Sequence, residues 1–172
     1  TREYIYKVYG VLAKVIYPGV DISRFKSMNL KRKPYVMSVG GIEENKGFAN
    51  IVNALALIPE DKRPSLTIVA GRRQPRIYSE LVASAKEKKV ELSIVENISD
   101  DELIRLYNEA SAVVFAPLME PFGLVSLESM ACGTPVIGIR EAGLRETIVD
   151  GETGILVDRD EEELASAILM LT

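Results

Sequence analysis

Short apolar runs alternate with amphipathic stretches along most of this chain, and this alternation restricts the fold more than any other feature. Residues 35–39 are rich in strand-forming side chains and end at a Gly-Gly pair. Apolar residues then recur at helical spacing over 48–55, and this pattern stops before Pro59. Strand–helix alternation at this pitch is typical of βαβ units with right-handed crossovers. We therefore expect an α/β fold, a Rossmann-like doubly wound parallel sheet of about six strands with helices on both faces.

The same two patterns predict the remaining elements. Further strands are expected at residues 66–70, 90–95, 112–116, 135–139 and 154–157. Further helices are expected at residues 77–88, 99–108, 124–131, 144–148 and 161–170. The run 112–116 is almost wholly apolar, which favours a central strand. Ligands of such sheets bind at the carboxyl ends of the strands near the switch point. This rule predicts a site built from the loops 40–47, 117–123 and 140–146.

The first 30 residues do not follow the repeating pattern. Residues 1–10 are predicted as a helix, and residues 15–19 as a strand that runs into a turn. We interpret residues 1–30 as a connection from an N-terminal region that this chain lacks, and residues 31–172 as a single domain.

Composition excludes several classes of function. The chain has 172 residues and no histidine, which removes Ser-His-Asp triads and most zinc sites from within it. A net charge of −4 without a basic block argues against nucleic acid as a partner. The single cysteine, Cys132, falls in an apolar helical stretch, which favours a buried thiol over a nucleophile. No run approaches the ~18 apolar residues of a transmembrane helix and no signal peptide opens the sequence, so a cytoplasmic protein, either free or peripheral to a membrane, is the default expectation.

Two glutamates flank the start of the predicted helix 124–131. Glu120 lies in the preceding loop and Glu128 lies on the helix, and eight helical residues rise roughly 12 Å. This separation suits the two ends of a nucleoside diphosphate sugar. Phe122-Gly123-Leu124 would form the helix N-terminus, whose N–H groups favour a phosphate. The alternative is a pair of solvated carboxylates, but Glu128 has apolar neighbours, among which an unpaired carboxylate is costly to bury.

A glycine-bounded loop from Gly40 to Gly47 precedes the helix over 48–55. Lys46 would lie at the start of that helix, where a cation opposes the helix dipole and a phosphate would resolve the conflict. The alternative is an exposed lysine without a role. The loop matches neither a Walker P-loop nor a dinucleotide fingerprint. Asp158-Arg159-Asp160 has the D-x-D spacing of some metal sites, but the helix after it favours N-capping, so we expect no metal site.

Residues 120–137 resemble the E-x7-E signature of the retaining glycosyltransferases with two Rossmann-like domains, the GT-B enzymes of family 4 or group 1 type. The resemblance continues through residues 143–146 and 150–154, and residues 17–25 resemble the connection between the two domains of that family. It therefore covers nearly the whole chain and corresponds to the C-terminal, donor-binding half of a GT-B fold.

The resemblance implies roles for the matching positions. Glu120 would lie at the transferred sugar and Lys46 at the diphosphate, and both count as catalytic. Glu128 would bind the ribose hydroxyls, and the base would lie near residues 95–98. The donor-binding set implied in this way is Gly40, Gly41, Lys46, Val95, Asn97, Ile98, Glu120, Phe122, Gly123, Leu124, Val125 and Glu128.

The implied reaction is transfer of a hexose from a nucleotide sugar, GDP-mannose or a UDP-hexose, to a sugar or lipid-linked acceptor. The resemblance further implies a metal-independent reaction without a cofactor, and a mannosyltransferase is one version of it. The chain would be inactive alone, because the N-terminal acceptor-binding domain is missing. A non-catalytic nucleotide-binding module and a sugar-nucleotide epimerase of the same architecture remain as alternatives.

Two positions depart from the family pattern. The family usually has an arginine where Gly41 stands, so one charge-assisted diphosphate contact, about 1.5–3 kcal/mol, is lost unless Arg72 or Arg145 replaces it. The family also often has glycine where Glu96 stands, near the base. The sequence thus leaves the base, the hexose, the acceptor, the linkage and the oligomeric state open.

Overall fold

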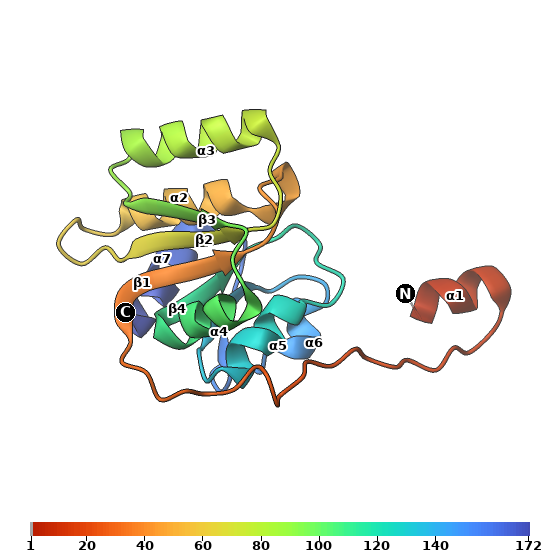
Figure 1. The fold of residues 1–172 in the computed structure, drawn as a ribbon. Coiled ribbons are helices and arrows are strands. Elements are labelled where there is room, and N and C mark those ends of the chain that lie inside the picture. The colour runs from red at the N-terminus through yellow and green to blue at the C-terminus, as the bar shows by residue number, and fades with distance from the viewer. Residues whose placement is uncertain (1) are drawn as a thin grey trace.

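The structure, a computed structural model that describes residues 2–172, contains a six-stranded sheet in the order β3-β2-β1-β4-β5-β6 (Figure 1). Every pairing in it is parallel. The strands are β1 (Lys33–Val39), β2 (Ser65–Ala70), β3 (Leu92–Glu96), β4 (Ala110–Phe115), β5 (Val136–Ile139) and β6 (Gly154–Val157). This is the strand order of a Rossmann-like sheet, in which the winding direction reverses between β1 and β4. The predicted fold class is therefore confirmed, and β4 is central, as its apolar sequence predicted.

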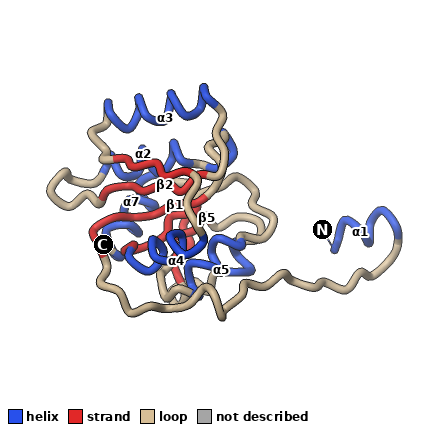
Figure 2. Tube along the Cα trace, in the orientation of Figure 1, coloured by secondary structure: helices blue, strands red, loops and turns tan. Residues whose placement is uncertain are grey.

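Helices cover both faces of the sheet (Figure 2). One face carries α2 (Phe48–Leu57), α3 (Pro75–Glu87) and α7 (Glu161–Leu171). The other face carries α4 (Asp100–Glu109), α5 (Leu124–Ala131) and α6 (Leu144–Thr147). A short 3-10 helix, η1 (Glu44–Lys46), precedes α2. Helices lie on both faces because the strand order reverses its direction at the switch point. A right-handed crossover to a strand on one side places its helix on one face, and a crossover to the other side places its helix on the opposite face.

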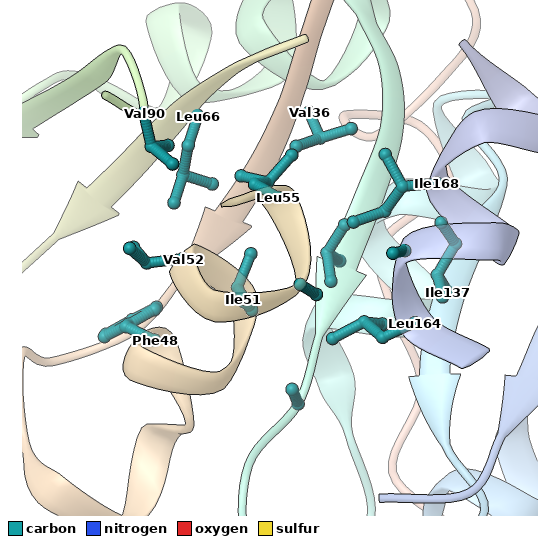
Figure 3. Close-up of a cluster of buried hydrophobic side chains, with 14 of the residues drawn as sticks. Val36, Phe48, Ile51, Val52, Leu55, Leu66, Val90, Ile137, Leu164 and Ile168 are labelled. Atoms are coloured by element: carbon teal, nitrogen blue, oxygen red, sulfur yellow. The ribbon is translucent and has the colours of Figure 1, made fainter. Parts of the chain in front are cut away.

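Five of the six strands supply side chains to two separate cores, because successive residues point to opposite faces, and β3 supplies only one of them. Val36 of β1 packs against α2 and α7, whereas its neighbours Tyr35 and Met37 pack on the side of α4. Figure 3 shows Val36 with Leu55 of α2 and Ile168 of α7 in the first of these cores. The two cores together hold the strand ends in fixed positions. The loops of the candidate site begin at those ends, so the cores also fix where these loops start.

Of the helix and the strand predicted for the N-terminal segment, only the helix is present. The predicted helix is present as α1 (Arg2–Tyr9), which lies away from the sheet and has no buried residue (Figure 1). The strand predicted over residues 15–19 is wrong, since residues 10–21 have no regular structure and Ile16 is 82% exposed. Val15, Ile16 and Tyr17 favour strands, but that preference acts only where a partner strand and a packed face exist, and none of the six strands pairs with them.

The chain returns to the domain before β1. The ring of Phe25 packs edge-on against Tyr107 of α4, with centroids 6.3 Å apart. The guanidinium of Arg32 donates to the backbone carbonyls of Tyr107, Asn108 and Gly133, at 3.1, 2.9 and 2.7 Å. These contacts tie the segment on both sides of residue 30 to the ends of α4 and α5. The division of the chain into residues 1–30 and 31–172 stays a prediction.

Candidate functional site

The three loops singled out from the sequence lie together at one edge of the sheet. β1, β4 and β5 are parallel neighbours, so their carboxyl ends meet. The backbone N–H of Leu118 donates to the carbonyl of Asn45 at 2.8 Å, which joins loop 117–123 to loop 40–47. The N–H of Gly143 donates to the carbonyl of Glu120 at 2.9 Å, which joins loop 140–146 to loop 117–123. The three loops thus form one hydrogen-bonded unit.

Glycines permit this close approach of the loops. Gly47 has a φ of 71°, and a Cβ on it would lie 2.0 Å from the carbonyl oxygen of Ala116. A Cβ on Gly143 would lie 2.3 Å from the carbonyl oxygen of Pro121. Both neighbours are backbone atoms, so a larger residue at either position would force the loops apart.

Lys46 and Glu120 meet at the junction of the first two loops. The Nζ atom of Lys46 lies 3.6 Å from Oε2 of Glu120, and the two side chains are only 25% and 19% exposed. Partial burial reduces screening by water, so the lysine ammonium is held at this place more firmly than in a surface pair. The stem of Lys46 passes over Gly40, where a Cβ would lie 3.6 Å from its Cδ.

A second cation lies over the neighbouring glycine. A Cβ on Gly41 would lie 3.1 Å from Cγ and 3.3 Å from Nε of Arg72. Glu43 holds this guanidinium, with 2.7 Å between Nε and Oε1. Arg145, the other candidate to replace the missing arginine, is exposed on α6. Lys46 and Arg72 therefore flank the Gly40–Gly41 turn, and an arginine at position 41 would compete with Arg72 for the same space.

A hollow of about 450 Å³ opens beside this turn, at the carboxyl ends of β1, β2 and β3. Its lining consists of Val39, Gly40, Gly41, Val69, Ala70, Gly71, Arg72, Asn97, Ile98, Ser99, Asp100 and Leu103. Asn97 and Ile98, predicted to lie near a base, are part of this lining. Val95, predicted with them, lies inside β3 opposite Val69 and does not line the hollow. The volume suits a small-molecule site, typically ~300–1,000 Å³.

Glu128 lies on α5 and accepts a hydrogen bond from the hydroxyl of Tyr107, 2.8 Å from its Oε2. Burial raises the pKa of Glu128 above its usual range, the hydrogen bond from Tyr107 opposes that rise, and the Asp100 carboxylate adds to it. Burial holds the pKa of Tyr107 well above 10, so its phenol stays a donor. Sequence reasoning missed Tyr107. The available signal was a tyrosine within a buried helix face, since a buried hydroxyl needs a partner.

The N-terminus of α5 presents backbone donors to the same edge. Gly123 is the N-cap residue with a φ of 93°, and no side chain caps the first turn. Leu124 is exposed, Val125 is partly buried, and Phe122 lies just before the helix. The ring of Tyr17 stacks on Phe122 with centroids 5.5 Å apart, so the N-terminal segment reaches this loop.

The D-x-D motif has a structural role in the described chain. Asp160 caps α7, as predicted, by accepting from the N–H groups of Glu162 and Glu163. Arg159 pairs with Glu141 and also donates to two backbone carbonyls where loop 117–123 begins, those of Ala116 at 3.1 Å and Pro117 at 2.8 Å. Across residues 2–172, no three His, Cys, Asp or Glu side chains gather in a way that could hold a metal ion.

Two further sequence expectations concern Cys132 and membrane spans. Cys132 is fully buried, as predicted, and burial raises the pKa of its thiol to about 11. In the part of the chain that the structure describes, no helix combines the length and the apolar character needed to cross a membrane.

Comparison with known proteins places this chain in a family. The family model for glycosyl transferases group 1 matches residues 20–171. The glycogen synthase of Mycobacterium tuberculosis is 32% identical over 163 residues, which is 90% of this chain and 38% of that protein. The D-inositol 3-phosphate glycosyltransferase of Pseudarthrobacter chlorophenolicus is 32% identical over 158 residues, 82% of this chain and 37% of that protein.

A solved structure agrees with these matches. The sucrose-phosphate synthase from Thermosynechococcus elongatus superposes with a TM-score of 0.81 at 29% identity, over 98% of this chain and 46% of that one. This chain therefore spans less than half the length of the proteins it matches. The matched model covers the whole sheet and its loops, and the chain belongs to the group 1 glycosyl transferases.

Proposed function

We propose that this chain is the donor-binding part of a retaining hexosyltransferase, which takes the hexose of GDP-mannose or a UDP-hexose to a sugar or lipid-linked acceptor. The observation that carries the proposal is the meeting of Lys46 and Glu120 at the N-terminus of α5, beside a hollow of about 450 Å³. A cation, a helix N-terminus and a carboxylate at one place suit the diphosphate–sugar junction of such a donor.

The remaining groups fit the rest of the donor. The diphosphate would lie between Lys46, Arg72 and the first-turn N–H groups of α5. The base would enter the hollow lined by Asn97 and Ile98, and the ribose hydroxyls would donate to Glu128. Charge on the departing diphosphate would then be neutralised by side-chain cations and a helix dipole, which is a way to stabilise a leaving group without a metal ion.

We further propose that the chain binds the donor but does not by itself transfer the hexose to an acceptor. The groups that bind the acceptor would lie in a region like the one that the matched relatives have outside the part that this chain matches. Assay of the chain with labelled UDP-glucose and GDP-mannose and a panel of sugar acceptors should give background transfer only. Turnover by the chain itself would show that the acceptor site lies within these residues.

Binding is tested by calorimetric titration with UDP, GDP and ADP in metal-free buffer. We expect selective binding of one nucleotide and a large loss of affinity in Glu128→Ala. As a control, Glu102→Ala changes a partly buried glutamate in the first turn of α4 and should bind as the wild type does. A generic nucleotide-binding module predicts instead that Glu120→Gln and Glu128→Gln leave affinity unchanged. An epimerase of this architecture would be recognised by its product, an isomerised nucleotide sugar.

A further inference from the structure

Tyr107 connects the packed interior of the domain to the candidate site. It lies on α4, is fully buried, and is among the largest side chains in the core. Its hydroxyl reaches Oε2 of Glu128 on α5 at 2.8 Å. Glu128 itself is only partly buried, so one end of its carboxylate faces the core while the residue keeps access to the surface.

Three groups fix Tyr107 in place. Its backbone carbonyl accepts hydrogen bonds from Arg32 at 3.1 Å and from the hydroxyl of Thr134 at 2.6 Å. The ring of Phe25 packs edge-on against its ring. The phenol therefore has little freedom to move, and a carboxylate bonded to it takes a defined orientation.

A carboxylate has two oxygens with about four acceptor positions in total. Because the Tyr107 hydroxyl occupies one position on Oε2, Oε1 stays open to a further donor. A ribose ring presents two neighbouring hydroxyl donors, and a carboxylate whose plane is already fixed can accept from them without losing further rotational freedom. We infer that Tyr107 is a positioning residue that orients the Glu128 carboxylate toward the ribose hydroxyls of a nucleotide; this rests on the function proposed above.

The charges around Glu128 make the inference testable by pH. On α4 it faces Tyr107 and the Asp100 carboxylate, which is paired with Arg24, and at the C-cap of its own helix it faces the Cys132 thiol. Burial and Asp100 raise the pKa of Glu128, and the Tyr107 hydrogen bond lowers it. Removal of the hydroxyl should raise that pKa further, so the ionised carboxylate would be lost at a higher pH.

The chain offers a matched control. Tyr35 is also buried, and its hydroxyl donates at 2.8 Å to the backbone carbonyl of Leu106, away from Glu128. Tyr107→Phe and Tyr35→Phe therefore remove the same group from similar surroundings. UDP is titrated into both variants, with GDP as the second probe. We expect Tyr107→Phe to weaken binding about tenfold, as loss of a hydrogen bond to a charged group does, and Tyr35→Phe to leave it unchanged.

Two readouts separate positioning from a general effect on folding. In a Glu128→Ala background, Tyr107→Phe should cause no further loss, because its effect passes through that carboxylate. From about pH 8 to about pH 5, the ratio of wild-type to Tyr107→Phe affinity should grow, while the ratio for Tyr35→Phe stays constant. The Tyr35 control also removes any titration of the nucleotide itself from the comparison.

The outcomes are distinct. If Glu128→Ala binds both probes as the wild type does, the proposed function fails together with the inference. If Glu128→Ala weakens binding but Tyr107→Phe does not, the inference alone is overturned. An equal loss from Tyr107→Phe with and without Glu128 would also overturn it, since the effect would then come from packing.

Discussion

The Nζ atom of Lys46 lies 3.6 Å from Oε2 of Glu120, although the two residues follow different strands of the sheet. They meet because β1 and β4 are paired neighbours at the point where the winding direction reverses. Gly47 allows the loop of Lys46 to pack against the backbone of Ala116, just before the loop of Glu120. A cation and a carboxylate thus come together where α5 begins.

Replacement of Lys46 should affect the phosphates of a ligand far more than its nucleoside. Loss of one charge-assisted contact, about 1.5–3 kcal/mol, corresponds to a weakening of roughly tenfold to a hundredfold. Titration of Lys46→Met with UDP or GDP should show this loss, whereas uridine or guanosine should bind nearly as before. Lys62→Met, at an exposed lysine outside the site loops, serves as the control. An unaltered diphosphate affinity in Lys46→Met would remove the lysine from the phosphate site.

Arg72 should be exchangeable with an arginine at position 41. Arg72→Ala should weaken the nucleoside diphosphate about tenfold, because one cation beside the glycine turn is lost. Gly41→Arg alone should bring little gain, since its Cβ would lie 3.1 Å from Cγ of Arg72. The double variant Gly41→Arg/Arg72→Ala should recover most of the affinity in calorimetric titration. Failure of Arg72→Ala to change affinity would show that this cation has no part in binding.

Gly47 should be far less tolerant of substitution than Gly71. Gly47 has a positive φ and meets a backbone carbonyl, whereas a Cβ on Gly71, at the end of β2, would have no neighbour within 4 Å. Gly47→Ala should lower the free energy of unfolding by about 2 kcal/mol or more, and Gly71→Ala should change it by less than about 0.5 kcal/mol. Urea unfolding monitored by circular dichroism measures both. Similar values for the two variants would contradict the close loop packing.

Arg159 should make the stability of the protein depend on pH through Glu141. The Arg159 guanidinium holds the pKa of Glu141 below its usual range, so this pair stabilises the fold above the pKa of an unfolded glutamate. The contribution is lost as the pH falls through the lower, folded pKa. Arg159→Met should therefore unfold more easily than the wild type at neutral pH, by about 2 kcal/mol.

The difference between Arg159→Met and the wild type should narrow in acid. It should not vanish, because Arg159 also donates to the carbonyls of Ala116 and Pro117, and carbonyls do not titrate in this range. Urea unfolding between about pH 7 and about pH 3 measures the difference. A difference that stays constant over this range would show that Glu141 contributes nothing through its charge.

The fold was predictable because its signals are local. The apolar run of β4 predicted a central strand. Ser99 and Glu102 have the spacing of a capping box, in which the Ser99 hydroxyl accepts from the N–H of Glu102. The three site loops also followed from the sequence, because the carboxyl ends of parallel strands share one edge. The strand predicted over residues 15–19 failed because composition cannot report whether a partner strand exists.

The finer geometry of the candidate site was not predictable from the sequence. The contact of Tyr107 with Glu128 joins two helices, and the packing of Arg72 over Gly41 joins the ends of two strands. The spacing of residues along the sequence does not show which side chains of different helices or strands will touch. The same holds for Arg159, whose capping motif gives no sign that its side chain would hold the loop that carries Glu120.

The most direct test of the proposed donor site is a crystal structure of the protein with UDP or GDP bound. The account predicts diphosphate oxygens within hydrogen-bond distance of Lys46 and of the first N–H groups of α5, with the ribose hydroxyls on Glu128. Binding instead in the hollow of about 300 Å³ between α2 and α3, or with the diphosphate directed away from Lys46, would contradict it.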